Sequence, residues 1–313
     1  MRDQIIDYIG LWKDKTGLPA TTLIAWIGLP RSTYHTWKDR YGKPNDHNGK
    51  IQRDWWLADW EKQAIVDFHD AHPLEGYRRL TYMMMDADVV SASPATVYRV
   101  LSEAGRMGKR AKASSSKGNG FKQPEKPHDH WHVDISYINC GGTFYYLITV
   151  LDGFSRMIVH HELRESMKEL DVEIVCQRAL EKHPDAKPRL ISDNGPQFLA
   201  GDFKAFVRQS GMTHVRTSPY YPQSNGKLER FHGTLKQECV RPACPRDAAE
   251  AIAKIAAYVE HYNTRRLHSG IGYITPADRM AGKSKAIHEA RDRKLVEARE
   301  RRKAEAKAAR QAA

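Results

Sequence analysis

The 313-residue sequence lacks several features that define other protein classes. It has only four cysteines (Cys140, Cys176, Cys239 and Cys244) and no Cys-x-x-Cys pair, which disfavours a disulfide framework or a structural zinc site and predicts a reducing, cytosolic compartment. No apolar run approaches the ~20 residues that a bilayer span needs. The first residues also lack the apolar stretch of a signal peptide, so we expect no membrane partner.

The sequence also has fewer acidic than basic residues. It contains 38 Asp and Glu residues against 50 Lys and Arg residues, so the net charge is +12. Such an excess indicates a polyanionic partner, most often nucleic acid. The excess is not uniform. Residues 106–127 hold 7 basic and 1 acidic side chains, and residues 283–313 hold 11 and 5, whereas the remaining segments are nearly neutral.

Segment 106–127 is rich in Gly, Ser, Lys and Arg and nearly free of large apolar residues, so it cannot offset the entropy cost of ordering. We interpret it as a basic flexible linker. Segment 283–313 is dense in Ala, Arg, Lys and Glu, and this composition predicts a basic tail that forms a solvated helix at best. Both segments are expected to bind DNA through their charge.

Two helix-turn-helix patterns precede the linker. Over residues 21–38, Gly28 supplies a turn between two helical segments, Pro30 suits a first helical position, and Gly42 follows as a stop. Ordinary helical hairpins share this pattern, but basic and hydroxyl side chains around the second helix favour contact with DNA. The predicted DNA-contacting residues are Arg31, Thr33, Tyr34, Lys38 and Arg40.

The second pattern comprises a helix over about 78–85 and another that begins at Ser93-Pro94 and ends at Gly105. After the linker, three β-rich runs over 130–138, 143–151 and 155–163 are separated by glycine-containing turns. Helices and short strands then alternate along the chain, with helices expected at 168–183 and 197–211. The fold class predicted for this part is a mixed α/β sheet, preceded by an all-α region.

Three carboxylates stand at positions that suggest chemistry. Asp134 lies inside an otherwise apolar strand, where a carboxylate is costly unless it is paired or holds a metal. Asp193 follows a short strand, and Glu229 lies on a later helix, with 35 residues between the two carboxylates. Carboxylates that converge on one sheet edge suit two Mg²⁺ or Mn²⁺ ions roughly 3.5–4 Å apart, the arrangement used for in-line phosphoryl transfer.

Several sequence motifs surround these carboxylates. They are the strand 131–137, Asp-Gly-Phe-Ser-Arg at 152–156, the segment 192–198, Ser-Pro-Tyr-Tyr-Pro-Gln-Ser-Asn-Gly-Lys-Leu-Glu-Arg-Phe-His at 218–232, and the segment 262–276. With them, residues 128–280 closely resemble the catalytic core of the retroviral integrase superfamily, and in particular the OrfB-type transposases of bacterial insertion sequences.

This resemblance implies an RNase H-like core, with Asp134, Asp193 and Glu229 as the catalytic and metal-binding Asp-Asp-35-Glu triad. It also implies Mg²⁺-dependent DNA cleavage and strand transfer at element ends, and a DNA contact by Lys236, seven residues after the glutamate. The zinc-binding His-His-Cys-Cys module of retroviral integrases is absent. The implied domains are 1–55 and 56–105 (helix-turn-helix), 106–127 (linker), 128–282 (catalytic core) and 283–313 (tail).

The expected partners are double-stranded DNA at element ends and target, further copies of the chain assembled on DNA, and an OrfA subunit or frameshift fusion, in the bacterial cytoplasm with the nucleoid. Two alternatives stay open: a catalytically silent regulator that binds terminal repeats, and an RNase H-like nuclease.

Other residues near the triad receive secondary roles. Tyr220 and Tyr221 are more suited to packing on DNA than to nucleophilic attack. The alternating His128, His130 and His132 are interpreted as a DNA-facing or solvated row rather than metal ligands. His232, one turn after Glu229, is a secondary candidate for the site.

Overall fold

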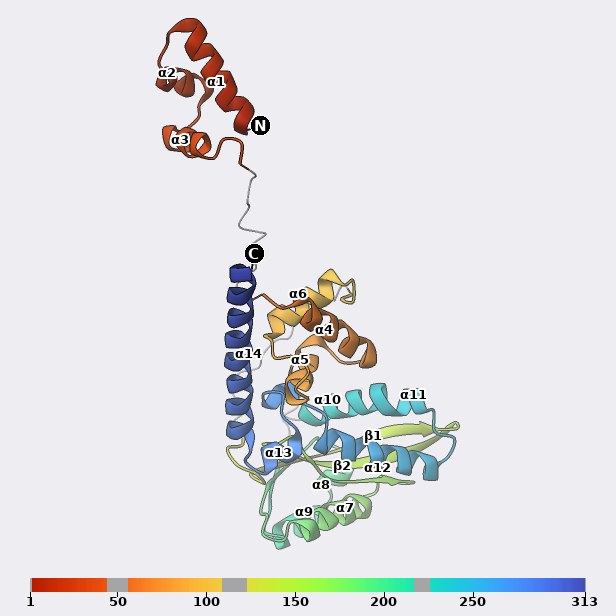
Figure 1. Ribbon diagram of the computed structural model, residues 1–313. Helices are drawn as coiled ribbons and strands as arrows, with labels where there is room; N and C mark the ends of the chain where they lie inside the picture. Colours follow the sequence, from red (N-terminus) through yellow and green to blue (C-terminus); the bar gives the residue numbers. More distant parts are fainter. Residues whose placement is uncertain (1, 44–55, 109–122, 217–225, 313) are drawn as a thin grey trace. The chain divides into compact units, whose positions relative to one another are not determined.

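The computed structural model describes residues 2–43, 56–108, 123–216 and 226–312. The chain divides into two compact units, one formed by Met1–Trp56 with Ala306–Ala313 and the other by Leu57–Glu305 (Figure 1). The described helices include none that is long and apolar enough to cross a membrane.

The first unit contains a helix-turn-helix at the predicted position. Its helices are α1 (Arg2–Thr16), α2 (Ala20–Ile27) and α3 (Arg31–Asp39). Gly28 ends α2 in the left-handed region (φ 71°), and its N–H donates to the carbonyls of that helix. The small core consists of Ile9, Leu23, Ile24 and Tyr34.

The second unit begins with a helical region of three helices: α4 (Asp59–Ala71), α5 (Tyr77–Asp86) and α6 (Pro94–Glu103). The side chain of Ser93 accepts a hydrogen bond from the Thr96 N–H at 3.3 Å, so the predicted N-cap of α6 is confirmed. Leu80, Val97 and Leu101 are fully buried where these helices meet.

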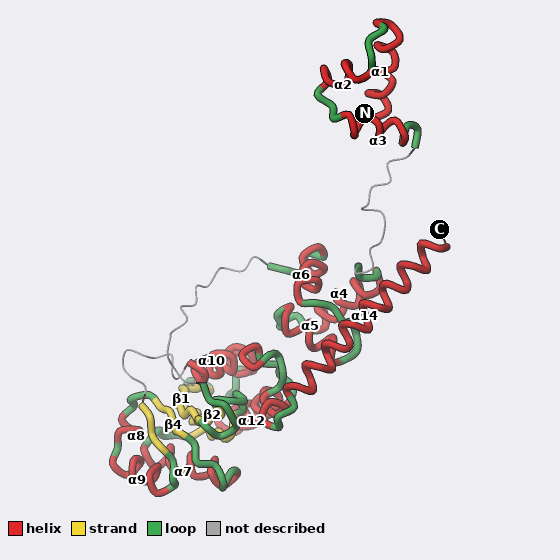
Figure 2. The backbone as a smooth tube through the Cα atoms, turned by 90° about the vertical axis from the view of Figure 1, so that its left-hand side faces the viewer, coloured by secondary structure: helices red, strands yellow, loops and turns green. Residues whose placement is uncertain are grey.

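The tail forms helix α14 (Ser284–Ala312), and most of its described residues are exposed as expected, but one side of the helix is buried. Arg291 and Arg302 are almost fully buried and form ion pairs with Asp86 of α5 and Glu61 of α4. Figures 1 and 2 show α14 running beside these helices. Composition indicated a polar helix, but the partners that cover it lie some 200 residues earlier in the chain.

The rest of the second unit is built on a five-stranded sheet in the order β3-β2-β1-β4-β5. Its strands are β1 (His130–Cys140), β2 (Thr143–Asp152), β3 (Ile158–Arg164), β4 (Arg189–Ser192) and β5 (Thr213–Arg216). The first three are antiparallel, whereas β4 runs parallel to β1 and β5 parallel to β4. This mixed sheet is the RNase H-like arrangement that the sequence predicts.

Side chains alternate between the two faces of the sheet. Trp131 and Val133 of β1 enter one core, against α7 (Glu169–Lys182) and α9 (Gly201–Gln209). Ile138 and Cys140 enter the other core, against α10 (Gly226–Leu235) and α12 (Ala248–Thr264). Figure 1 shows these two helical layers on opposite sides of the strands.

Short elements complete the unit. They are α8 (Pro196–Leu199), η2 (Lys236–Val240), α11 (Arg241–Ala243), η3 (Ser269–Ile271) and α13 (Pro276–Met280). The single helix expected over 197–211 is divided into α8 and α9, because Ala200 adopts an extended backbone (φ −58°, ψ 151°).

Candidate active site

Asp134 lies near the middle of β1, opposite Thr149 of β2, on the face that α10 covers. Its side chain is only 17% exposed. One carboxylate oxygen accepts a hydrogen bond from the Ile135 N–H at 3.0 Å, and the other lies 3.5 Å from Nδ1 of His232. His232 also reaches Oγ1 of Thr149 through Nε2 at 3.3 Å. The carboxylate is therefore oriented by its own strand and by His232 of α10, which Thr149 of β2 contacts in turn.

Asp193 follows directly after β4 and is exposed. The parallel pairing of β1 with β4 ends at His132 and Ile191, and Asp134 and Asp193 each follow two residues later in the chain. Its Oδ1 accepts a hydrogen bond from the Gly195 N–H at 2.9 Å, in the turn that leads into α8. The first two predicted carboxylates thus lie on β1 and directly after its neighbour β4.

Glu229 lies in the first turn of α10, where a carboxylate interacts favourably with the helix dipole. Leu228, Phe231 and Leu235 turn one side of the helix into the core and leave Glu229 exposed. His232, the residue that contacts Asp134, lies one turn further along the same helix. Glu229 therefore lies on the same helix as the residue that contacts Asp134, three positions before it.

The described residues contain no cluster of three His, Cys, Asp or Glu side chains gathered as a metal site. The structure places one carboxylate on β1, a second directly after the neighbouring strand β4, and a third on α10, whose His232 contacts the first.

Comparison of the sequence with known proteins identifies the family to which the chain belongs. Two models of an integrase core domain match the chain, over residues 124–222 and 210–276. The transposase of insertion sequence IS904 from Lactococcus lactis is 32% identical over 174 residues, which cover 54% of this chain and 69% of that protein. This chain belongs to the insertion-sequence transposases.

Two further relatives match a larger share of this chain. The 39.2 kDa protein of insertion element IS476 from Xanthomonas euvesicatoria is 30% identical over 231 residues; these cover 68% of this chain but only 62% of that relative's length. The transposase of IS629 from Shigella sonnei is 23% identical over 269 residues, which cover 82% of this chain and 89% of that protein.

Among solved structures, the HTLV-2 integrase catalytic core in complex with magnesium matches with 20% identity and a TM-score of 0.39, over 50% of this chain and 98% of that one. The catalytic core of BIV integrase matches with 20% identity and a TM-score of 0.38, over 51% and 99%.

Lys227 is a residue of the site that sequence reasoning missed. Its Nζ donates to the carbonyl of Gly153 at 3.0 Å, and burial, together with nearby Arg156, lowers the pKa of this lysine to about 7. Asp152, fully buried in the same turn, accepts hydrogen bonds from the Ser155 N–H and hydroxyl at 2.7 Å. The Asp-Gly-Phe-Ser-Arg motif was the available signal, and the structure shows that this turn anchors the start of α10.

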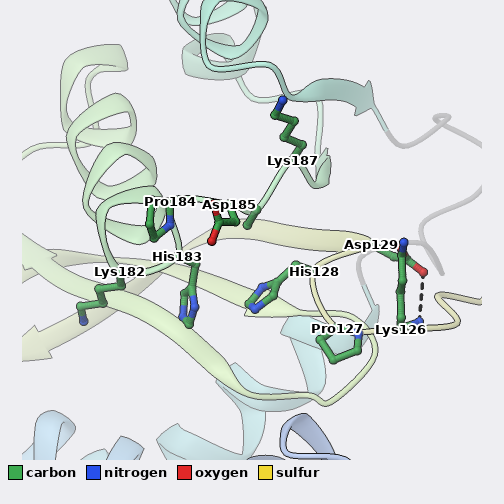
Figure 3. Close-up of a pocket in the computed structure, with 10 residues that line it drawn as sticks. Lys126, Pro127, His128, Asp129, Lys182, His183, Pro184, Asp185 and Lys187 are labelled. Carbon is green, nitrogen blue, oxygen red and sulfur yellow. Dashed lines mark hydrogen bonds between the residues drawn. The ribbon is translucent and has the colours of Figure 1, made fainter.

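The row of histidines at the start of β1 is buried rather than solvated or DNA-facing, so that interpretation is wrong for His130 and His132. Burial lowers the pKa of His130. His128 is partly exposed; its Nδ1 accepts from the Trp131 indole at 3.1 Å, and its ring lies 4.5 Å from that of His183. Figure 3 shows these two rings side by side in a hollow lined by the segments that precede β1 and β4.

Lys236 begins η2, directly after α10, and is partly buried. It borders a groove at the tip of the β1–β2 hairpin. Tyr220 and Tyr221 lie outside the described residues.

The residues predicted to contact DNA in the first unit divide into two groups. Arg31, Lys38 and Arg40 are exposed on and just after α3, and Thr33 is partly exposed. The prediction for Tyr34 is wrong, because this residue is only 7% exposed and belongs to the core of the unit. The hydroxyl suggested a polar contact, but the residue lies on the face of α3 that packs against α1 and α2.

Proposed function

We propose that this transposase catalyses Mg²⁺-dependent cleavage of DNA at the ends of its insertion element and transfer of the released strand into target DNA. The observation that supports this most is that Asp134 lies on β1 and Asp193 directly after the neighbouring strand β4, while the helix that carries Glu229 contacts Asp134 through His232. Family membership supports the same chemistry.

The donor chemistry of the three residues fits a hard divalent cation. Carboxylate oxygens are preferred ligands of Mg²⁺ and Mn²⁺, and Asp193 and Glu229 are open to solvent. Asp134, Asp193 and Glu229 would hold two ions. When bound, such ions activate the attacking oxygen and stabilise the leaving oxygen of an in-line displacement.

Residues outside the carboxylate triad position the site or bind DNA. His232 and Thr149 hold the Asp134 side chain in place, while Lys227 fixes the first turn of α10 against Gly153. Lys236 binds a phosphate near the scissile bond. In the first unit, Arg31, Thr33, Lys38 and Arg40 contact DNA at the element ends.

Water attacks the phosphodiester at an element end and releases a 3′-hydroxyl, which then attacks a target phosphodiester. No covalent link between protein and DNA is needed, in keeping with a site built from carboxylates. Because two ends are joined, the active form is an assembly of at least two copies on DNA, in the bacterial cytoplasm with the nucleoid. An OrfA product, separate or fused by frameshifting, is a further partner.

The test uses linear DNA that carries the element's own terminal repeats, and a matched DNA with scrambled repeats. We expect Mg²⁺-dependent nicking at the repeat boundary followed by joining to a target plasmid, and neither reaction with scrambled repeats or with EDTA. Repeat binding without nicking would instead indicate a silent regulator. Cleavage of RNA–DNA hybrids regardless of the repeats would indicate an RNase H-like nuclease.

A further inference from the structure

A groove lies at the tip of the β1–β2 hairpin, where the hairpin meets the segment that follows α10. We call it the hairpin-tip groove and define it by Tyr137, Phe144, Lys236, Arg241 and Arg246. Its volume is about 530 Å³. The function described above assigns a role only to Lys236, so the rest of this surface needs its own explanation.

The charged residues that line the groove are all cationic: Lys236, Arg241 and Arg246, with no acidic side chain among the lining residues. Arg241 is exposed and has no acidic partner among the described residues. Arg246 lies 3.3 Å from Glu250, but its side chain is 89% exposed, and such a solvated pair is weak and readily exchanged for a phosphate. This charge pattern suits a polyanionic backbone.

Two large aromatic rings are exposed at the same place. Tyr137 is 50% exposed and Phe144 57% exposed. Tyr137 is held in position by the edge of Tyr146, with ring centroids 5.3 Å apart, and by a hydrogen bond to the sulfur of Met167 at 3.5 Å. Exposed rings beside cations are the combination that binds single-stranded nucleic acid, with bases stacked on the rings and phosphates on the charges.

The walls of the groove are held together by a close backbone contact. Gly141 at the hairpin tip has φ 58°, and a Cβ there would lie 2.5 Å from the carbonyl oxygen of Arg246. Pro245 is buried beside it. Since this contact leaves no room for a side chain, the hairpin tip lies directly against the opposite wall, and the groove is formed before any ligand binds.

The cationic side of the groove is the side nearer the candidate active site. Lys236 follows Glu229 by seven residues, about two helical turns and roughly 10 Å. Tyr137 is three residues after Asp134 on β1, roughly 10 Å along the strand, and its side chain projects from the opposite face of the sheet. A strand bound at the carboxylates would therefore reach Lys236 within a few nucleotides, with the two rings on the far side of the groove.

We propose that the hairpin-tip groove binds an unpaired nucleotide of the DNA strand next to the scissile phosphate, with its base stacked on Phe144 and Tyr137 and its phosphates held by Lys236 and Arg241. The nucleotide is unpaired because a base within a duplex hides both ring faces in its own stack. This proposal rests on the proposed function, since it assumes that DNA is the substrate.

The test measures binding of the full chain to two DNA probes in EDTA. One is a duplex with a three-nucleotide 3′ overhang that carries 2-aminopurine, and the other is the blunt duplex of the same sequence. We expect wild type to quench the 2-aminopurine and to bind the overhang more tightly. Phe144→Ala and Tyr137→Leu should each weaken overhang binding about 5- to 100-fold and leave blunt-duplex binding unchanged. Leu170→Ala, at an exposed apolar residue on α7, is the matched control.

Equal binding of both probes by wild type, or an undiminished preference for the overhang in both aromatic variants, would overturn the proposal. So would variants that lose self-association but keep the preference, since the groove would then be a protein interface. Because the assay contains no metal, it is independent of catalysis. Overhang preference without cleavage would contradict only the proposed function, whereas end-specific cleavage without the preference would contradict only the groove.

Discussion

His268 shows how one half-buried residue couples the stability of this transposase to pH. Its Nδ1 accepts the N–H of Gly270 at 3.0 Å and so caps the short helix η3, which requires an unprotonated nitrogen. Burial, reinforced by the positive charge of Arg156 and Arg266, lowers the pKa of His268 to about 3. The folded protein therefore keeps this imidazole neutral under conditions where the unfolded chain protonates it.

The consequence is a loss of stability in acid. Below the ordinary histidine pKa of about 6.5 the unfolded state takes up a proton that the folded state refuses, so His268 contributes fully above pH 6.5 and progressively less as the pH falls towards 3. Between pH 7 and pH 5 the free energy of unfolding should fall by on the order of 2 kcal/mol from this residue. Urea unfolding at both pH values measures the change.

His268→Asn is the informative variant, since asparagine keeps a side-chain acceptor for Gly270 but does not titrate. Its stability should fall less between pH 7 and pH 5 than that of wild type. Half-buried His161, whose pKa is lowered to about 4, also reduces the free energy of unfolding in acid. This contribution is the same in wild type and variant, so it cancels when the two are compared. An identical fall in wild type and variant would contradict this account of His268.

At single residues, the sequence indicates a side chain that is unusual for its position, but it does not indicate contacts with residues far away in the chain. Asp134 was predictable because a carboxylate within an apolar strand is conspicuous. Lys227 was not, because its low pKa arises from a turn 74 residues earlier in the chain. Tyr34 was misinterpreted because its buried position depends on how α3 packs against α1 and α2, which a short helix with polar residues on most sides does not reveal.

At the scale of elements, the tip of the β1–β2 hairpin requires glycine for two separate reasons, backbone conformation and lack of space. Gly141 and Gly142 both have positive φ, 58° and 93°, and side chains are disfavoured at both. Only Gly141 meets a neighbour, the carbonyl oxygen of Arg246 at 2.5 Å from an ideal Cβ, whereas nothing lies within 4 Å at Gly142.

Alanine substitution separates the two effects. Gly142→Ala should cost about 1–2 kcal/mol from backbone strain alone. Gly141→Ala should cost about 2–4 kcal/mol, because the tip must also move away from Arg246. Urea unfolding of the two full-length variants tests this difference. Equal costs would mean that the hairpin tip does not lie against the Arg246 backbone as described.

The strands were the most predictable elements, since glycine-containing turns mark the ends of β1 and β2 and β-rich residues fill the intervals. The helices were predicted less well where tertiary contacts decide their limits. The break between α8 and α9 follows from the extended backbone of Ala200, a residue that by propensity favours a continuous helix.

At the scale of the whole molecule, α14 shows that part of the basic excess of the tail is used in ion pairs within the protein. Four of its basic residues form ion pairs with the helical region: Arg291, Lys294, Arg301 and Arg302. Glu61 is fully buried. Burial opposes its ionisation, but hydrogen bonds from Arg302 and from the Ala58 N–H outweigh this and bring its pKa below the ordinary value. Part of the tail's charge thus holds the second unit together and is not available to DNA.

Arg302→Ala tests this role of α14. Loss of the guanidinium leaves Glu61 with Arg301 as its remaining ion-pair partner and removes the hydrogen bond to the Ser91 carbonyl. We expect the free energy of unfolding to fall by about 3 kcal/mol, whereas Arg299→Ala, at an exposed position of the same helix, should change it by no more than about 0.5 kcal/mol. Equal effects would show that the tail is not docked through Glu61.

The central claim is that Asp134, Asp193 and Glu229 act together in metal-dependent DNA cleavage. The most direct measurement is the single-turnover cleavage rate of end-bearing DNA in Mg²⁺ for Asp134→Asn, Asp193→Asn and Glu229→Gln, with Glu260→Gln, an exposed glutamate of α12, as the control. Each triad variant should retain DNA binding but cleave at least roughly 10²- to 10³-fold more slowly, and the control should match wild type. A triad variant that cleaves at the wild-type rate would contradict the account.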